Sequence, residues 1–147
     1  MTRIGDKLAN VLLICLLILC LVAVLQAQPF GPDKIPLPEH PRPNFQRPLW
    51  QNLNGPWHFR FDPDDKGKEQ KWFKGGFEFP LTIMVPFSWG SKLSGVKDEA
   101  DIGWYQREIT IPELWKGQRV FVVVGACDWH TTIWLNGNLV GTHQGGY

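Results

Sequence analysis

Acidic side chains stand close together at two places in this sequence. The two groups are Asp62, Asp64 and Asp65, and Asp98, Glu99 and Asp101. Two neighbouring carboxyl groups can divide acid and base work between them when the environment raises the pKa of one. The first group surrounds a proline in a turn, where aspartate caps backbone amides and faces water. The second group precedes an expected strand, on a loop that could line a cleft, although exposure for solubility is the favoured interpretation.

A metal site is not expected from these residues. Asp62, Asp64 and Gly67 have a spacing similar to that of a calcium loop. However, Lys66 stands at a ligand position and Phe73 stands where the bidentate glutamate belongs, so the calcium interpretation fails.

Cysteine and histidine provide the other candidates for chemistry. Cys127, Asp128 and His130 could be imagined as metal ligands, but alternation along a strand sends neighbouring side chains to opposite faces, and no second ligand pair follows. His143 stands beside two glycines and lacks an orienting carboxylate in the nearby sequence, which favours a hydrogen-bonded structural histidine over a general base. We expect no metal and no cofactor.

The first 27 residues have the pattern of a secretory signal peptide. Arg3 and Lys7 precede an apolar run at residues 11–25, and Ala27 occupies a cleavage position. As a helix the run would span about 22 Å, short of the roughly 30 Å hydrocarbon core, so a retained anchor is the weaker alternative. A lipid-modified Cys20 is disfavoured by bulky preceding residues. We predict cleavage after Ala27 and a secreted or periplasmic protein without a stable membrane partner.

The predicted mature chain is electrically neutral and has one cysteine. Removal of residues 1–27 leaves equal numbers of basic and acidic residues. With no basic stripe to attract phosphate backbones, nucleic acid is excluded as an expected partner. Cys127 remains without a partner for an intrachain disulfide, and its apolar neighbours predict a small buried core residue.

Proline and residue alternation predict the elements that position these side chains. Residues 28–48 form a proline-rich arm, expected to wrap over the folded part because Phe45, Leu49 and Trp50 would otherwise be exposed. The remaining residues, 49–147, form one β domain. The expected strands are residues 57–61, 81–85, 104–111, 120–124, 131–135 and 138–142. The Asn136-Gly137 pair predicts a tight hairpin turn. The fold class is therefore all-β, an antiparallel jelly roll or β-sandwich.

Six short blocks with many glycine, proline and tryptophan residues occur along the β domain. They are Leu53-Asn54-Gly55-Pro56-Trp57-His58-Phe59, Val85-Pro86-Phe87-Ser88-Trp89, Gly103-Trp104-Tyr105-Gln106-Arg107, Ile111-Pro112-Glu113-Leu114-Trp115, Trp134-Leu135-Asn136-Gly137 and His143-Gln144-Gly145-Gly146-Tyr147. In this order they resemble the N-terminal sugar-binding domain of glycoside hydrolase family 2, which includes β-galactosidases, β-glucuronidases and β-mannosidases. The likeness covers residues 45–147.

The resemblance implies a jelly-roll domain that precedes an immunoglobulin-like domain and a catalytic barrel. In the family, two barrel glutamates cleave β-glycosides with retention through a covalent intermediate. Neither barrel segment is in this sequence, and the acidic residue by which the domain reaches the barrel pocket would lie beyond residue 147. We therefore expect a domain incomplete at its C-terminus, with β-linked carbohydrate and the two further domains as partners. A stand-alone carbohydrate-binding module and a membrane-tethered adhesion domain are the alternatives.

Tryptophan is abundant enough to suggest stacking on sugar rings. Trp57, Trp104 and Trp134 lie in expected strands and are assigned to the core, whereas Trp72 and Trp89 are the better candidates for exposed contact. The candidate residues for carbohydrate binding or for a domain interface are Trp89, Asp98, Asp101, His143 and Tyr147.

Overall fold

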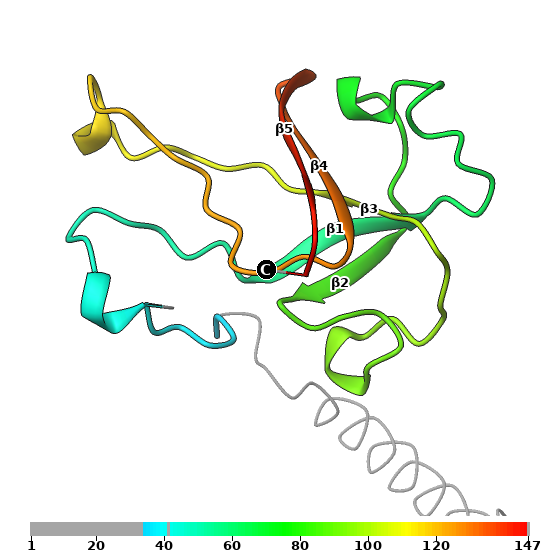
Figure 1. Ribbon diagram of the computed structural model, residues 1–147, viewed down its shortest axis with the longest axis horizontal. Coiled ribbons are helices and arrows are strands. Elements are labelled where there is room, and N and C mark those ends of the chain that lie inside the picture. The colour runs from blue at the N-terminus through cyan, green and yellow to red at the C-terminus, as the bar shows by residue number, and fades with distance from the viewer. Residues whose placement is uncertain (1–33, 41, 147) are drawn as a thin grey trace, which may run out of the picture. The chain divides into compact units, whose positions relative to one another are not determined.

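The computed structural model describes residues 34–40 and 42–146, and these residues form two antiparallel β-sheets without an α-helix (Figure 1). The predicted signal peptide, the beginning of the proline-rich arm and Tyr147 lie outside the described residues. Within the described part of the chain, no helix is both long and apolar enough to cross a bilayer. The all-β, antiparallel prediction is confirmed.

The larger sheet has three strands in the order β2-β1-β3. Strand β1 is Gly55–Phe61, β2 is Leu81–Val85 and β3 is Gly103–Gln106. In the register of this sheet, Trp57 lies opposite Ile83 and Phe59 lies opposite Tyr105. Since side chains alternate along a strand, this register gathers the odd-numbered aromatic residues of β1 on one face of the sheet.

That face carries the main hydrophobic core. Phe59, Ile83 and Val96 are buried together, and Trp57, Phe61, Val85 and Trp89 pack around them. The Phe59 ring lies 4.8 Å from the Phe61 ring and 4.9 Å from the Tyr105 ring, measured between centroids. Gly103 is part of this packing, because a Cβ atom there would lie 2.8 Å from the Phe59 ring. Full burial of one such phenylalanine contributes roughly 1.5–3 kcal/mol to folding.

The opposite face of the sheet holds a second aromatic cluster. The Trp104 ring lies 5.7 Å from the Trp72 ring and stacks on the Trp134 ring at 5.1 Å. Trp72 is 4% exposed, so its assignment to an exposed contact site was wrong. Its burial follows from the 3-10 helix η2, Trp72–Lys74, which lies over the sheet beside Trp104. Gly67 packs on the Trp104 indole with no room for a side chain.

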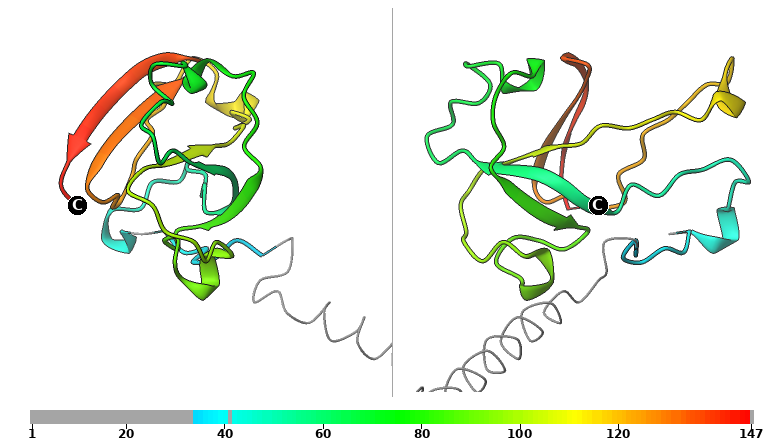
Figure 2. Two further views of the ribbon diagram at one scale, coloured as in Figure 1. Left: turned by 90° about the vertical axis from the view of Figure 1, so that its right-hand side faces the viewer. Right: turned by 180° about the vertical axis from the view of Figure 1, so that it is seen from behind.

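The second sheet is the hairpin of β4, His130–Leu135, and β5, Asn138–Gln144, whose two strands run side by side in both views of Figure 2. Its turn confirms the Asn-Gly prediction, since Asn136 and Gly137 both have positive φ, 49° and 76°. A register shift between Ile133 and Trp134 interrupts the ladder. The hairpin is held to the sheet through Trp134, which also stacks on Phe73 at 5.1 Å.

Two expected strands are shorter or missing in the structure. Strand β3 ends at Gln106 rather than at residue 111, and residues 120–124 are extended but lie outside any strand. Residues 107–129 instead run outward from the sheet and back, with Glu113–Trp115 (η4) at the far end (Figure 1). The correction has a physical reason: a strand needs a neighbour for its backbone bonds, and no described strand pairs with this segment.

The proline-rich arm contacts the β domain through a few polar groups rather than through its large apolar side chains. The Asn54 side-chain amide donates to the Pro36 carbonyl at 3.0 Å, and the Asn52 amide donates to the Leu37 carbonyl at 3.0 Å. Pro36 is buried, but Phe45 is 76% exposed. The expected wrapping is therefore correct for residues 36 and 37 and wrong for Phe45.

The Leu53-Asn54 segment is held by an arginine from strand β3's end. The Arg107 guanidinium donates to the Leu53 carbonyl at 2.6 Å and to the Asn54 carbonyl at 3.1 Å. The same group lies 5.8 Å from the centre of the Trp57 ring. Two of the six sequence blocks therefore meet in space through hydrogen bonds.

Candidate functional site

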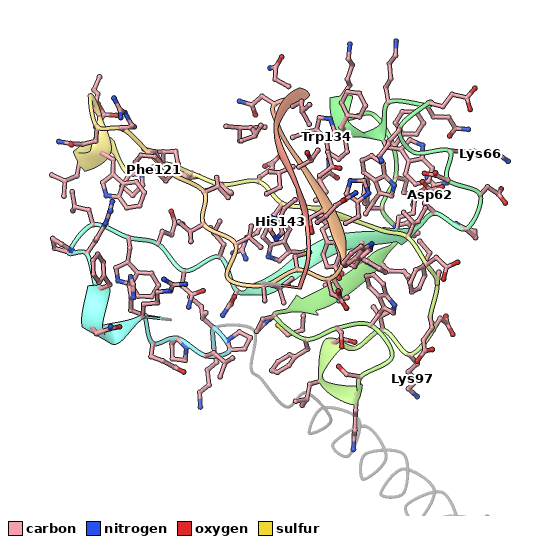
Figure 3. All side chains as sticks on the ribbon, in the orientation of Figure 1. Asp62, Lys66, Lys97, Phe121, Trp134 and His143 are labelled. Carbon is pink, nitrogen blue, oxygen red and sulfur yellow. The ribbon has the colours of Figure 1, made fainter. Side chains whose placement is uncertain are left out.

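The first acidic group is a structural element of the sheet. Asp62 is 2% exposed and accepts hydrogen bonds from the Lys66 and Gly67 backbone amides, both at 2.8 Å, and from the Trp104 indole at 2.9 Å. The prediction that it caps amides is confirmed, but it does not face water. Figure 3 shows Asp62 beneath the turn that carries Lys66.

The charge on Asp62 is stabilised by these partners. Burial acts most strongly on the pKa of this carboxyl and would raise it, but the three hydrogen bonds and the nearby Arg60 cation together hold the pKa below its ordinary value. A carboxyl with a lowered pKa and filled acceptor positions cannot act as a general acid near neutral pH. The neighbouring Asp64 forms an exposed ion pair with Lys66 at 2.9 Å.

The second acidic group lies beside Trp89. Trp89 packs against the Phe59 and Phe61 rings at 5.7 and 5.9 Å. The Gly90 amide donates to the Val96 carbonyl at 2.9 Å, and the Glu99 carboxylate lies against Gly90, 2.6 Å from where a Cβ atom would be. The structure therefore brings Trp89 and the loop of Asp98 and Asp101 to the same end of the sheet. Both aspartates are exposed there.

Tyr105 has the one strongly perturbed side chain near this group. Burial against the core, and secondarily the negative charge that Cys127 carries when ionised, raise the pKa of Tyr105 to about 12. The phenol is therefore neutral at physiological pH and can only donate or accept a hydrogen bond.

His143 lies on a different element from Trp89 and the aspartates. It stands on β5 opposite Thr131, and Figure 3 shows it on the hairpin, away from Lys97 of the acidic loop. Beyond it, the Gly145 amide donates to the Trp129 carbonyl at 2.7 Å. Sequence-predicted Tyr147 lies outside the described residues. Thus the structure unites three of the five candidates and places His143 apart.

The segment before β4 contradicts the sequence analysis. Cys127 is exposed, not a buried core residue. The reason is that residues 120–127 lie in the outward loop, where no described element covers them. Asp128 and His130 form no metal-ligand group with it, and no cluster of three potential ligands occurs among the residues that the structure describes.

A polar cavity that the sequence analysis missed lies between η2 and the hairpin turn. It has a volume of about 280 Å³ and is lined by Lys74, Asn136, Gly137 and Asn138. Sequence spacing identified Asn136 and Gly137 only as turn residues. Their position beside Lys74 depends on the Phe73–Trp134 stack, a contact between residues far apart in sequence.

Comparison with known proteins identifies the domain to which these elements belong. The family described as glycosyl hydrolases family 2, sugar binding domain, matches residues 50–147. This chain belongs to glycosyl hydrolases family 2. Its family 2 segment contains the sheet, both aromatic clusters, the hairpin and the polar cavity.

The similar family 2 proteins are β-glucuronidases. That of Paenibacillus borealis is 30% identical over 99 residues, and that of Canis lupus familiaris is 32% identical over 108 residues. In each case the match covers 66% of this chain and 17% of the relative. The chain therefore spans about a sixth of the length of the relatives it matches.

Solved family 2 structures agree with the fold. A β-glucuronidase of an uncultured Clostridium species has a TM-score of 0.56 and 35% identity, covering 66% of this chain and 18% of that one. The Ruminococcus gnavus β-glucuronidase in complex with a C6-substituted uronic isofagomine has a TM-score of 0.61 and 28% identity, covering 70% and 18%. The same enzyme is also solved in complex with D-glucuronic acid. The described fold is that of the N-terminal domain of these enzymes.

Proposed function

We propose that this chain is the N-terminal sugar-binding domain of a secreted, β-glucuronidase-like retaining glycoside hydrolase whose bond cleavage is performed by residues outside the chain. The observation that carries the proposal is the family match over residues 50–147, together with relatives that are all β-glucuronidases and far longer than the matched segment.

The described carboxylates support a binding role rather than a catalytic one. A retaining glycosidase needs two carboxyl groups about 5–5.5 Å apart, one of them with a raised pKa. Asp62, the one buried acidic side chain among the described residues, has a lowered pKa and three hydrogen-bond donors around it. Asp98 and Asp101 are exposed on their loop, where water stabilises their charge.

Turnover by the isolated chain is the direct test of this division of labour. We expect the purified 147-residue chain to hydrolyse no aryl β-glucuronide, β-galactoside or β-mannoside. Turnover that disappears in Asp101→Asn would place catalysis in the acidic loop and overturn the proposal. The matched control is Asp64→Asn, which removes a carboxylate from an exposed ion pair on a different turn.

Secretion is the second part of the proposal and has its own test. The apolar run at residues 11–25 and Ala27 at the cleavage position support removal of residues 1–27. We expect mass spectrometry of the exported protein to give Gln28 as its first residue. An intact Met1 on the exported, folded protein would contradict secretion by cleavage and support a retained anchor.

A further inference from the structure

The polar cavity between η2 and the hairpin turn has the size of a site for one small ring. Its volume of about 280 Å³ lies just below the range of about 300–1,000 Å³ that holds drug-sized ligands. A single pyranose ring is the largest common metabolite unit that such a space accommodates. Extended oligosaccharides would have to leave the cavity through its open side.

The lining of the cavity is cationic and amide-rich. Lys74 provides an ammonium group, and Asn136 and Asn138 provide side-chain amides that can both donate and accept hydrogen bonds. No acidic residue lines the cavity. The ion pairs among the described residues join Lys66 to Asp64 and Lys116 to Glu113, so no described carboxylate neutralises Lys74. An anionic group would complete this site, and hydroxyl groups would match its amides.

The walls of the cavity are held in place by the fold. Next to Lys74, Phe73 stacks on Trp134 with an interplanar angle of 7°. On the hairpin side, the Asn138 side chain donates to the Asn136 carbonyl at 3.2 Å. Gly137 has a φ of 76°, and a Cβ atom there would lie 3.6 Å from the Lys74 side chain. Because the turn requires glycine at this position, the space above Lys74 is kept free of side chains.

We propose that this cavity binds an acidic monosaccharide, with its carboxylate on the Lys74 ammonium and its ring hydroxyls on Asn136 and Asn138. The site lies on a different face of the hairpin turn from the Trp89 and Asp101 group and is independent of it. The choice of a sugar as the carrier of the carboxylate rests on the proposed function. The choice of an acidic sugar rests on Lys74 and on the absence of any acidic lining residue.

Surface plasmon resonance tests the proposal with the full chain immobilised at low density, which prevents contact between copies. The probes are D-glucuronate, D-glucose and acetate, which separate the combined ligand from its ring and from its charge. A ligand of this size in an open site is expected to bind with a Kd of about 1 mM. We expect D-glucose and acetate to bind at least about tenfold more weakly, because each lacks one half of the recognised chemistry.

Two lysine variants locate the binding. Lys74→Ala should weaken D-glucuronate binding about tenfold, the loss expected for one charge-assisted hydrogen bond. Lys97→Ala removes the same charge from the exposed acidic loop, far from Trp134 in Figure 3, and should leave the affinity unchanged. Near-ultraviolet circular dichroism of both variants should match the parent chain, because Lys74 and Lys97 are exposed.

Three results would overturn the proposal. They are unchanged D-glucuronate affinity in Lys74→Ala, equal affinity for acetate and D-glucuronate, and no D-glucuronate binding at concentrations about tenfold above the expected Kd. None of them affects the proposed function, whose failure is recognised separately, by turnover of an aryl β-glucuronide by the chain alone.

Discussion

At the scale of single residues, Asp62 is the side chain on which the local structure most depends. It connects the end of β1 to the following turn and to Trp104 on β3, through two backbone amides and an indole N–H. A buried carboxylate is costly to desolvate, and only such a complete set of donors makes it favourable. The residue type that sugar enzymes use for chemistry serves here as a joint between strands.

The folded state should lose stability in acid because of Asp62. Its pKa in the folded chain is lowered from 3.8, so its contribution to the free energy of unfolding is fully present above pH 3.8 and is lost as pH falls through the folded value. Asp62→Asn should cost on the order of 3 kcal/mol at neutral pH, since an amide faces three donors with only one acceptor atom. It should also flatten the acid limb of the stability profile.

Urea unfolding at low micromolar concentration between pH 3 and 7 measures both effects. Asp64→Asn is the matched control, because its ion pair with Lys66 is exposed and should contribute less than about 1 kcal/mol. Equal acid sensitivity of Asp62→Asn and the parent chain would show that Asp62 is not the group responsible.

At the scale of elements, the hairpin is attached to the sheet through one tryptophan. Trp134 stacks on Trp104 of β3 and on Phe73 of η2, both with centroids 5.1 Å apart. Strand β5 is exposed along its whole length, so it adds little burial of its own. Position 134 therefore decides both where the hairpin lies and whether the polar cavity beside Lys74 exists.

Replacement of this tryptophan should detach the hairpin. Trp134→Ala removes two aromatic stacks and should lower the free energy of unfolding by about 3 kcal/mol. Trp129→Ala is the control, because that indole is 66% exposed, and the change should be within about 0.5 kcal/mol. Amide hydrogen exchange should show faster exchange in β4 and β5 for Trp134→Ala alone. Unchanged exchange would mean that other contacts hold the hairpin.

The elements were more predictable than their packing. Alternation around Phe59 and the Asn136-Gly137 pair identified β1 and the hairpin, because both signals are local. Trp72 was misassigned because its polar neighbours indicate a loop, whereas its burial comes from Trp104, a residue on another strand. The cavity beside Lys74 could not be foreseen for the same reason. Cys127 was misassigned in the opposite sense, since its apolar surroundings in sequence are themselves exposed.

At the scale of the whole β domain, residues 107–129 present an unpaired apolar segment. Every side chain from Val120 to Val124 is exposed, and Phe121 lies far from Asp62 in Figure 3. Extended backbone with free donors and acceptors is a template for pairing with another chain. At about 25 cal/mol per Å², covering roughly 300 Å² of such surface would contribute about 7 kcal/mol, which is comparable to the stability of a domain.

The isolated chain should therefore be marginally stable and self-associating. We expect sedimentation velocity at tens of micromolar to show oligomers, and Val122→Lys to reduce their fraction because a buried lysine opposes pairing. Gln51→Lys adds the same charge at an exposed polar position and should have no such effect. A monomer with a sharp, reversible thermal transition in the parent chain would contradict this prediction.

Gly67 and Gly103 give the molecule an unusual genetic sensitivity. Gly67 touches only the Trp104 side of the larger sheet, and Gly103 touches only the Phe59 side. A single added methyl group at either position wedges one aromatic cluster apart and leaves the other intact, at a cost of about 1–3 kcal/mol. Since 1 kcal/mol moves the melting temperature of a domain this size by about 4–8 °C, alanine at either glycine defines a conditional allele. Growth temperature would then select which side of the sheet is intact in a living cell.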